Sequence, residues 1–406
     1  MQIKNLRKET KDGLSRVVAT VVWEDVNGVS RDIYFETIDE FKDDLAINPD
    51  AFLVGSCLPA MYAGEKRIKI EGEICPILQK GIITNMQTFR RWYGWRYKPV
   101  AIEAKKKEIK AYSSQNKRAG LFLSGGVDST FSLRTNRLSF PLNHPLSIKD
   151  CFLIHGFDIS YDSHSKMKTN IFDRAFKNAL EIAQDAKVNL IPVTTNVRHL
   201  NSDVKFWEKW FHGAALSSVA HCFSSRISMI YIASSHSALN LEPWGSHPYL
   251  DPNYSSTDLK IIHDKLCARI DKIKIIADWD IALQKLRVCT QNHDELLNCG
   301  KCVMCIKTMV MLLTIGKLKN AEAFSVHDVT PQELEMAFRH QNQNDFKVNY
   351  LALVEQLKAR GRYDLAQAIL KGAGLKGMVR RFDEQYFGKN LTKVYSFFAN
   401  LIAQIN

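Results

Sequence analysis

The sequence contains no run of eighteen or more apolar residues, which is about the length that a membrane-spanning helix needs. Its first residues, MQIKNLRKETKDG, are polar, and no apolar segment follows their charges. A secretory signal peptide requires such a segment. No hydrophobic period is sustained along the chain, which argues against a repeat protein. We therefore expect a cytoplasmic protein with no membrane partner.

Composition excludes little else. Hydrophobic residues make up 46% of the chain, a value typical of globular proteins, and the length suffices for two or three domains. The formal net charge is +12. Such a charge suits nucleic acid or another polyanion, and it also suits an enzyme that handles triphosphates. A nucleic-acid partner therefore remains an alternative.

The stretch LFLSGGVDSTFSL (121–133) lacks both common nucleotide-binding patterns, the Walker A sequence and G-x-G-x-x-G. It has instead an apolar strand end, the loop SGGVDS and a helix expected from Thr130 onward. Glycines allow the backbone to approach a ligand closely, and the amides at a helix start attract negative charge. The stretch therefore predicts an anion site.

The same stretch resembles the SGGxDS pyrophosphate loop of the N-type ATP pyrophosphatases, which cleave ATP to AMP and pyrophosphate. The resemblance implies that Asp128, Ser124 and Ser129 act in catalysis, with Asp128 holding Mg²⁺ or orienting the loop. It also implies an ATP-binding set made of Leu123, Ser124, Gly125, Gly126, Val127, Asp128 and Ser129. The alternative is a glycine turn that only links a strand to a helix.

Four of the nine cysteines follow the spacing C-x9-C-x2-C-x2-C, at Cys289, Cys299, Cys302 and Cys305. Two consecutive C-x-x-C steps place thiolates within reach of one ion, and a fourth cysteine completes a closed, structural zinc site. An iron–sulfur cluster is the alternative metal, and His293 is an alternative ligand. The other five cysteines lie in apolar surroundings and are expected in the core; they are Cys57, Cys75, Cys151, Cys222 and Cys267.

A loop of the SGGxDS type followed by this cysteine cluster resembles the 7-cyano-7-deazaguanine synthases, over residues Lys117 to Gly316. The resemblance implies Zn²⁺ and favours it over iron. It also implies activation of 7-carboxy-7-deazaguanine by ATP, with ammonia as nitrogen donor and a nitrile as product. Longer relatives occur in bacterial antiphage operons, and some of them join the deazaguanine to a protein amine. A protein acceptor encoded nearby is therefore a second expected partner.

The middle of the chain predicts an α/β fold with a parallel sheet. Apolar strands are expected over 150–160, 187–196 and 227–235, and helices over 170–186 and 210–223. Ligands bind at the carboxyl ends of parallel strands. We therefore expect residues that follow the strands to face the nucleotide or the substrate; these are His155, Gly156, Asp158, Ser234, Ser235 and His236.

The segment SSHSALNLEPWGSHPYLDPNYSST is rich in rings and hydrogen-bonding groups, which suits recognition of a planar substrate. Its candidate contacts are Trp244, His247 and Asp251. The deazaguanine synthases have a YPDCR-like segment at about this place, and this chain departs from it with WGSHPYLDP. A rigid loop around a buried tryptophan is the alternative.

Four regions are expected. Residues 1–100 form a β-rich or α+β domain, with a hairpin turning at Asn27-Gly28 and further strands and turns over 58–82. A basic connector covers 101–117, and the core with its zinc site covers 118–316. Residues 317–406 form a helical extension, opened by a capping box at Thr330 to Glu333 and containing a helical hairpin that turns at Arg360-Gly361. Its end is basic, with Lys376 and Arg380 among others.

Three functions follow from these features. The first is an ATP-dependent ligase that adenylates a carboxylate, such as a 7-deazaguanine, for amide or nitrile formation. The second is a tRNA-modifying enzyme of the same superfamily, which the basic charge suits. The third is a nucleotide sensor or scaffold without catalysis, against which the intact SGGVDS argues.

Overall fold

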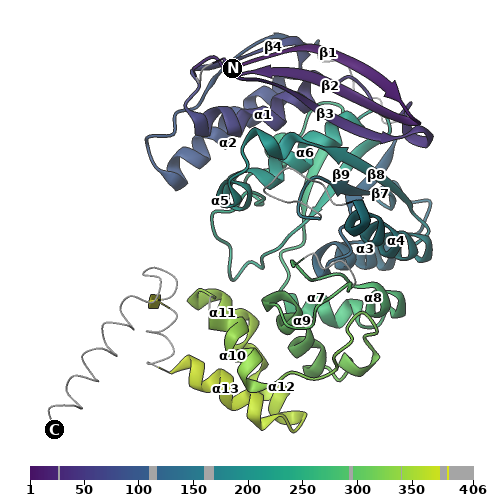
Figure 1. The fold of residues 1–406 in the computed structure, drawn as a ribbon, viewed down its shortest axis with the longest axis vertical. Coiled ribbons are helices and arrows are strands. Elements are labelled where there is room, and N and C mark those ends of the chain that lie inside the picture. Colours follow the sequence, from purple (N-terminus) through teal and green to yellow (C-terminus); the bar gives the residue numbers. More distant parts are fainter. Residues whose placement is uncertain are drawn as a thin grey trace, which may run out of the picture. The chain divides into compact units, whose positions relative to one another are not determined.

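The computed structural model describes residues 1–25, 28–108, 117–159, 169–291, 296–339, 341–374 and 382–383. The chain divides into two compact units (Figure 1). The first unit comprises Met1–Ser235 and Glu242–Lys265, and the second comprises His236–Leu241 and Leu266–Asn406. None of the helices among these described residues has the length and apolar character to cross a membrane.

The first unit is built on one ten-stranded sheet with the order β10-β9-β6-β7-β8-β3-β2-β1-β4-β5. The five strands from β10 to β8 are parallel. The pairs β8–β3, β3–β2 and β2–β1 are antiparallel, and β1–β4 and β4–β5 are parallel again. The predicted α/β class with a parallel sheet is confirmed. The strands are β1 (Gln2–Lys11), β2 (Leu14–Val22), β3 (Ser30–Ile38), β4 (Arg67–Ile74), β5 (Ala101–Lys106), β6 (Arg118–Phe122), β7 (Ile148–His155), β8 (Asn189–Thr195), β9 (Ile227–Ala233) and β10 (Lys260–Asp264).

Helices cover both faces of the parallel part of the sheet. The α-helices are α1 (Pro49–Ala63), α2 (Pro76–Tyr93), α3 (Val127–Ser139), α4 (Thr169–Asp185), α5 (Val204–Phe206) and α6 (His212–Cys222). Phe152 of β7 packs on Phe223, directly after α6, with ring centroids 5.1 Å apart, whereas His155 stacks on Phe172 of α4 at 4.5 Å. Side chains alternate between the faces of a strand. Helix α6 therefore covers one face, and α4 covers the other (Figure 1).

The N-terminal strands β1 to β4 belong to the same sheet as the strands of the predicted nucleotide-binding core. The sequence analysis predicted instead that residues 1–100 form a domain of their own. The connection is the pairing of β3 with β8, where Phe35 lies opposite Thr195. The hydroxyl of Thr37 also donates to the carbonyl of Pro192 at 2.7 Å. The predicted hairpin is present as β2 and β3, although Asn27 of its turn lies outside the described residues.

Helices α1 and α2 occupy much of the region where further strands and turns were predicted. Asn48 caps α1 by accepting from the backbone N–H of Asp50 at 3.1 Å, and Gly64 ends the helix at φ +83°. Pro49 and Pro76 each open a helix, a position where proline's fixed φ costs nothing. Residues 58–63 and 76–82, within the predicted strands and turns, are therefore helical. Only β4, between the two helices, matches the predicted strand character.

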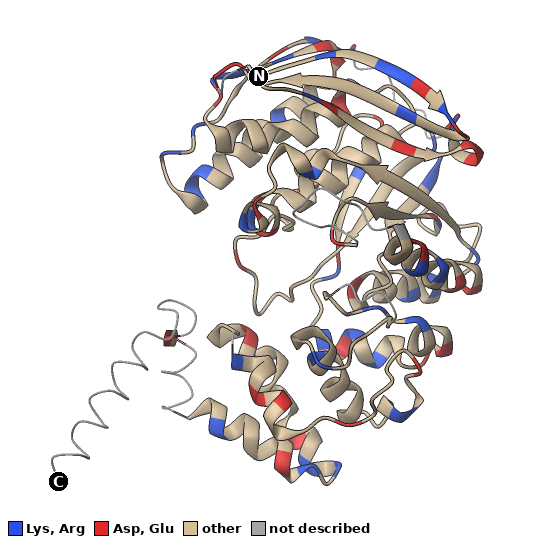
Figure 2. Ribbon diagram, viewed as in Figure 1, with Lys and Arg blue, Asp and Glu red and all other residues tan. Residues whose placement is uncertain are grey.

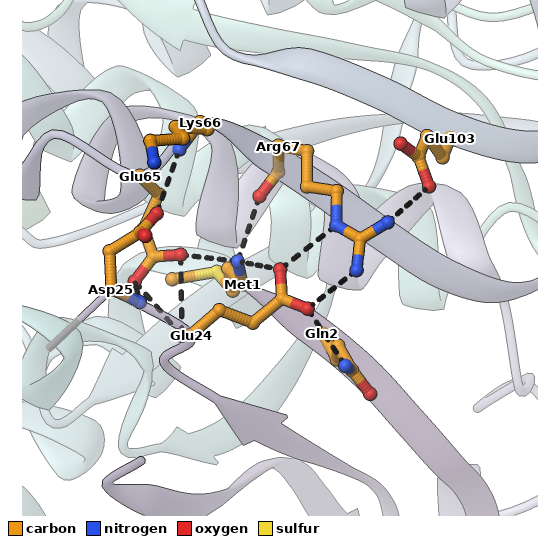
Figure 3. Close-up of polar contacts among 8 residues, drawn as sticks. All are labelled: Met1, Gln2, Glu24, Asp25, Glu65, Lys66, Arg67 and Glu103. Atoms are coloured by element: carbon orange, nitrogen blue, oxygen red, sulfur yellow. Dashed lines mark hydrogen bonds and ion pairs between the residues drawn. The ribbon is translucent and has the colours of Figure 1, made fainter. Parts of the chain in front are cut away.

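A polar network holds β1, β4 and the segment after β2 together (Figure 3). The α-amino group of Met1 is buried and donates to the carboxylates of Glu24 and Glu65 and to the carbonyl of Arg67. Arg67 in turn bridges Glu24 and Glu103. These contacts, mainly the hydrogen bond from Arg67, lower the pKa of Glu24 far below its usual range. The positive charges of Met1 and Arg67 are thus paired with carboxylates of the same network.

Charges of both signs share the β1–β3 surface (Figure 2). Arg7 pairs with Glu9 and with Asp32 of β3, and Arg16 pairs with Glu36. Arg7 and Arg16 on this surface therefore have acidic neighbours. The basic end of the chain, including Lys376 and Arg380, lies outside the described residues, as do residues 109–116 of the predicted connector.

The second unit is helical. Its helices are α7 (Arg269–Ile276), α8 (Asp280–Lys285), α9 (Val303–Thr314), α10 (Pro331–Arg339), α11 (Gln343–Asn349), α12 (Val354–Ala359) and α13 (Tyr363–Ala373). The predicted capping box is confirmed: the Thr330 N–H donates to Glu333 at 2.9 Å, and the Glu333 N–H donates to the Thr330 hydroxyl at 3.3 Å. The predicted helical hairpin is formed by α12 and α13, with Gly361 at φ +73° between them. The cysteine cluster belongs to this unit, whereas the predicted boundary at 316 placed it in the core.

Candidate functional site

The loop between β6 and α3 has the predicted strand, loop and helix geometry. Strand β6 ends at Phe122, and α3 begins at Val127, three residues earlier than predicted. Gly125 has φ +74°, a left-handed conformation that costs an L-residue about 1–2 kcal/mol. This glycine therefore makes the sharp turn from strand to helix.

The two serine hydroxyls of the loop lie side by side, with Ser124 Oγ and Ser129 Oγ 3.2 Å apart. Ser124 Oγ also accepts from the N–H of Gly126 at 3.3 Å, and Ser129 Oγ donates to the Gly126 carbonyl at the same distance. Ser124 is exposed, and Ser129 is buried. The motif thus places one hydroxyl at the surface of the loop and one at its base.

The start of α3 has no side-chain cap: its N-cap residue is Gly126. The first amides of a helix have no partner within the helix, and they carry the positive end of its dipole. Asp128, half-buried in the first turn, adds a carboxylate beside these amides. A site with amides, hydroxyls and one carboxylate can bind a phosphate together with a cation.

His155 and Asp158, predicted to contact ATP, follow the neighbouring strand β7. His155 is 6% exposed, and its Nε2 has no hydrogen-bond partner among the described residues. Burial lowers the pKa of His155, so it is neutral near pH 7. Asp158 is exposed and accepts hydrogen bonds from Trp207 Nε1 at 2.8 Å and from Arg198 at 3.3 Å. Gly156, between them, is buried at φ +101°.

Trp207 and Arg198 were not predicted as site residues. The Arg198 guanidinium lies over the Trp207 ring, 4.4 Å from its centroid. Trp207 opens a single π-helical turn, Trp207–Phe211, a feature often found at functional sites. Neither residue belongs to a sequence motif, and only their position after β8 could have drawn attention to them.

The predicted substrate residues of the segment 242–254 have different surroundings. Trp244 is half-buried, with the Lys209 ammonium 4.3 Å from its ring centroid. His247 is 5% exposed and packs edge-on against Trp92 at 5.0 Å. Asp251 is fully buried and accepts from the Ser246 hydroxyl at 2.6 Å and from His263 Nδ1 at 2.7 Å. Of the three, Trp244 is the most accessible to a ligand.

Close backbone contacts hold this segment in place. The N–H of Gly245 donates to the Glu208 carbonyl at 3.0 Å, and the N–H of Gly213 donates to the Gly245 carbonyl at 3.1 Å. A Cβ at Gly213 would lie 2.4 Å from that carbonyl. Only glycine allows the approach, so the segment is a fixed wall of the first unit.

The remaining predicted contacts follow β9. Ser234 is buried, and its N–H donates to the Asp264 carbonyl at the end of β10. Ser235 is exposed and ends the first unit's main segment, whereas His236 begins the second unit. The structure therefore places Ser234 and Ser235 at the carboxyl edge of the sheet and assigns His236 to a different unit.

The four predicted metal ligands come together in the second unit. The Sγ atoms of Cys289, Cys299, Cys302 and Cys305 all lie within 4.8 Å of one another. A tetrahedral zinc–thiolate site needs sulfur atoms about 3.8 Å apart, given bonds of about 2.3 Å. The cysteines of an iron–sulfur cluster bind different irons and are spread more widely. The arrangement could hold one metal ion such as zinc.

Local backbone geometry explains how the cluster forms. Cys302 is the N-cap of α9, Cys305 lies in its first turn, and Gly300 makes the preceding turn at φ +71°. The N–H of Cys302 donates to Cys299 Sγ at 3.3 Å. A hydrogen bond with Cys305 lowers the pKa of the Cys302 thiol to about 4. The same hydrogen bond raises the pKa of the Cys305 thiol, so of these two thiols Cys302 loses its proton first.

Asn298 brings the distant ligand Cys289 to the other three, and the sequence analysis missed it. Its Oδ1 accepts from the N–H groups of Val288 at 2.8 Å and Cys289 at 3.1 Å. Its Nδ2 donates to the carbonyls of Leu286 and Ala323 at 2.7 and 2.9 Å. The side chain is buried, and both its oxygen and its nitrogen are hydrogen-bonded to the backbone, which holds these segments together. In the sequence, only its position directly before Cys299 could have indicated this role.

His293, the alternative ligand, lies outside the described residues. All nine cysteines are free. Four of the five predicted core cysteines are buried, but Cys267 is half-buried, because it lies in the irregular segment between β10 and α7.

Comparisons with known proteins add no family to this description. No protein-family model, curated protein or solved structure matches the chain.

Proposed function

We propose that the chain is an ATP-dependent ligase that adenylates a carboxylate and releases pyrophosphate. One observation carries the proposal: the SGGVDS loop joins a buried parallel strand to an uncapped helix start, with a left-handed glycine at the turn. This geometry supports a phosphate ligand. The loop's resemblance to the pyrophosphate loop of the ATP pyrophosphatases supports cleavage between the α and β phosphates.

In the proposed reaction, a carboxylate oxygen of the substrate attacks the α-phosphorus, giving an acyl-adenylate and pyrophosphate. The loop amides and the hydroxyls of Ser124 and Ser129 bind the pyrophosphate oxygens, where negative charge develops. Asp128 would hold Mg²⁺, which neutralises the leaving group when bound. Gly125 and Gly126 keep the backbone amides accessible. No protein nucleophile is required, because positioning and electrostatics supply the catalysis.

The proposed carboxylate is 7-carboxy-7-deazaguanine. Support comes from the loop and the four-cysteine cluster occurring in the order typical of the deazaguanine synthases. The half-buried Trp244 ring beside Lys209 supplies a surface on which a planar heterocycle can stack. The four-cysteine site leaves no open coordination position for a substrate, so zinc would stabilise the second unit and take no part in the chemistry.

A nitrogen nucleophile then displaces AMP from the adenylate, giving an amide. The acceptor is ammonia in a nitrile synthase and an amine of a partner protein in the conjugating branch. A small acceptor such as ammonia needs no docking surface. The second unit and the strands β1 to β5 add surface on which a protein could dock, which favours a protein amine as acceptor.

The test is product analysis with ATP labelled at the α-phosphate, separated by thin-layer chromatography. We expect AMP and pyrophosphate, with turnover dependent on 7-carboxy-7-deazaguanine. ADP as the main product would contradict the assignment. Binding of ATP without turnover would favour the sensor alternative, and turnover dependent on tRNA would favour the tRNA-modifying alternative. Intact-mass measurement of proteins encoded nearby would then show whether one of them gains a deazaguanine.

A further inference from the structure

A buried histidine–aspartate pair lies beside the proposed substrate segment. His263 Nδ1 is 2.7 Å from Asp251 Oδ2, and the two side chains are 4% and 0% exposed. Ser246 donates to the same oxygen at 2.6 Å, and the N–H of His247 donates to Oδ1 at 3.3 Å. The carboxylate thus accepts three hydrogen bonds and is held in one orientation.

This geometry fixes the tautomer of His263. A carboxylate accepts hydrogen bonds, so Nδ1 carries a proton, and in the neutral ring Nε2 then presents its lone pair. Nε2 has no hydrogen-bond partner among the described residues. Leaving a buried acceptor unpaired costs about 1–3 kcal/mol. A ligand that donates a hydrogen bond to Nε2 would remove this cost.

The pair also lies at the edge of the sheet where ligands bind. His263 is the second-last residue of β10, which runs parallel to β9, and β9 runs parallel to β6. The carboxyl end of β10 therefore lies at the same edge of the sheet as the SGGVDS loop. Strands β10 and β6 are two strand spacings apart, about 10 Å. Asp251 lies at the start of α6, since its Oδ1 would be 2.7 Å from a Cβ at Gly213.

We propose that His263, oriented by Asp251, is the general base for the second half of the reaction; the inference rests on the proposed function. Nε2 accepts a proton from the nitrogen nucleophile as the lone pair of that nitrogen attacks the carbonyl carbon of the acyl-adenylate. The C–N bond forms, the bond between that carbon and the phosphate oxygen breaks, and AMP leaves as an anion. The proton on Nε2 passes to water. Asp251 acts as a positioning residue that stabilises the imidazolium.

The experiment separates the two half-reactions. Exchange of labelled pyrophosphate into ATP, driven by 7-carboxy-7-deazaguanine, reports adenylation. Mass spectrometry of the products formed with ammonium chloride or hydroxylamine reports the attack of nitrogen. In His263→Gln we expect exchange within about twofold of wild type and product formation lowered about 100-fold, the usual contribution of a general base. Asp251→Asn should show the same split with a smaller loss.

His144→Gln is the matched control, because His144 stacks on Phe140 after α3 and should leave both rates unchanged. If His263→Gln lowered exchange and product formation equally, or abolished both together with the cooperative melting transition, His263 would have a structural role only, and the proposal would be overturned. Unchanged product formation would overturn it too. No carboxylate-dependent exchange in the wild-type chain would contradict the proposed function itself, and the inference would fall with it.

Discussion

The SGGVDS loop and the four-cysteine cluster, the two proposed binding sites, are built in different ways. The loop uses six consecutive residues, and the groups proposed to bind phosphate are mostly backbone amides placed by one strand and one helix. The cluster uses four side chains, one of them in a separate segment that Asn298 brings into place. The loop needs only local geometry, whereas the cluster needs tertiary structure. Substitutions should therefore affect function at the loop and folding at the cluster.

The largest effect is expected for Cys302→Ser. Structural zinc contributes about 10–16 kcal/mol of binding free energy in zinc-finger peptides, and the second unit should lose its metal and much of its stability. Elemental analysis should find one zinc per chain in the wild type and almost none in the variant. Cys267→Ser, which changes a half-buried cysteine of the same unit, should retain the metal. Finding iron with sulfide in the wild-type protein would contradict the assignment of the cluster as a zinc site.

Asp128→Ala tests the opposite behaviour at the loop. We expect turnover of ATP to fall roughly 100- to 1,000-fold, a loss typical of removing one group that stabilises a transition state. The melting temperature should change little, because the side chain is half-buried at a helix start. Asp271→Ala is the control, since Asp271 is also a first-turn acid, in α7. Equal losses of stability with retained turnover would show that Asp128 serves the helix only.

Asn298→Ala tests whether the metal site depends on contacts that bring Cys289 to the other three cysteines. Removing the amide leaves two buried N–H groups unpaired and frees Cys289, so zinc affinity should fall roughly 10- to 100-fold. Competition with a chelator measures this. Asn136→Ala removes a similar buried amide that ties α3 to the segment before β7, and it should destabilise the protein without changing zinc affinity. Equal zinc affinities in the two variants would contradict the role of Asn298.

The smallest effect is expected for Gly125→Ala. Left-handed φ in alanine costs about 1–2 kcal/mol of stability, and the displaced amides should also lower turnover. Gly361→Ala has the same strain, at φ +73° with no atom near its Cβ, and should show a similar loss of stability by denaturant unfolding with normal turnover. If both variants turn over ATP normally, the loop glycine has no ligand role.

Local patterns in the sequence predicted the loop and the Thr330 capping box, and cysteine spacing predicted the members of the cluster, although not the role of Asn298 in assembling it. The pairing of β3 with β8 could not be predicted, since the side chains that face each other there have no pattern that links them. The same holds for Asp251. Its acidic side chain suggested a substrate contact, but its partners Ser246 and His263 come from the loop and from β10, and they place it in the interior.

The pairing of β3 with β8 also has a consequence for synthesis. Phe35 lies opposite Thr195, so β3 leaves the ribosome about 160 residues before its partner does. At roughly 5–20 residues per second, its free edge waits on the order of 8–30 s for β8. An unpaired strand edge can join the edge of another chain. The nascent chain can therefore aggregate through this edge during the interval, and a chaperone that binds extended strands would protect it then.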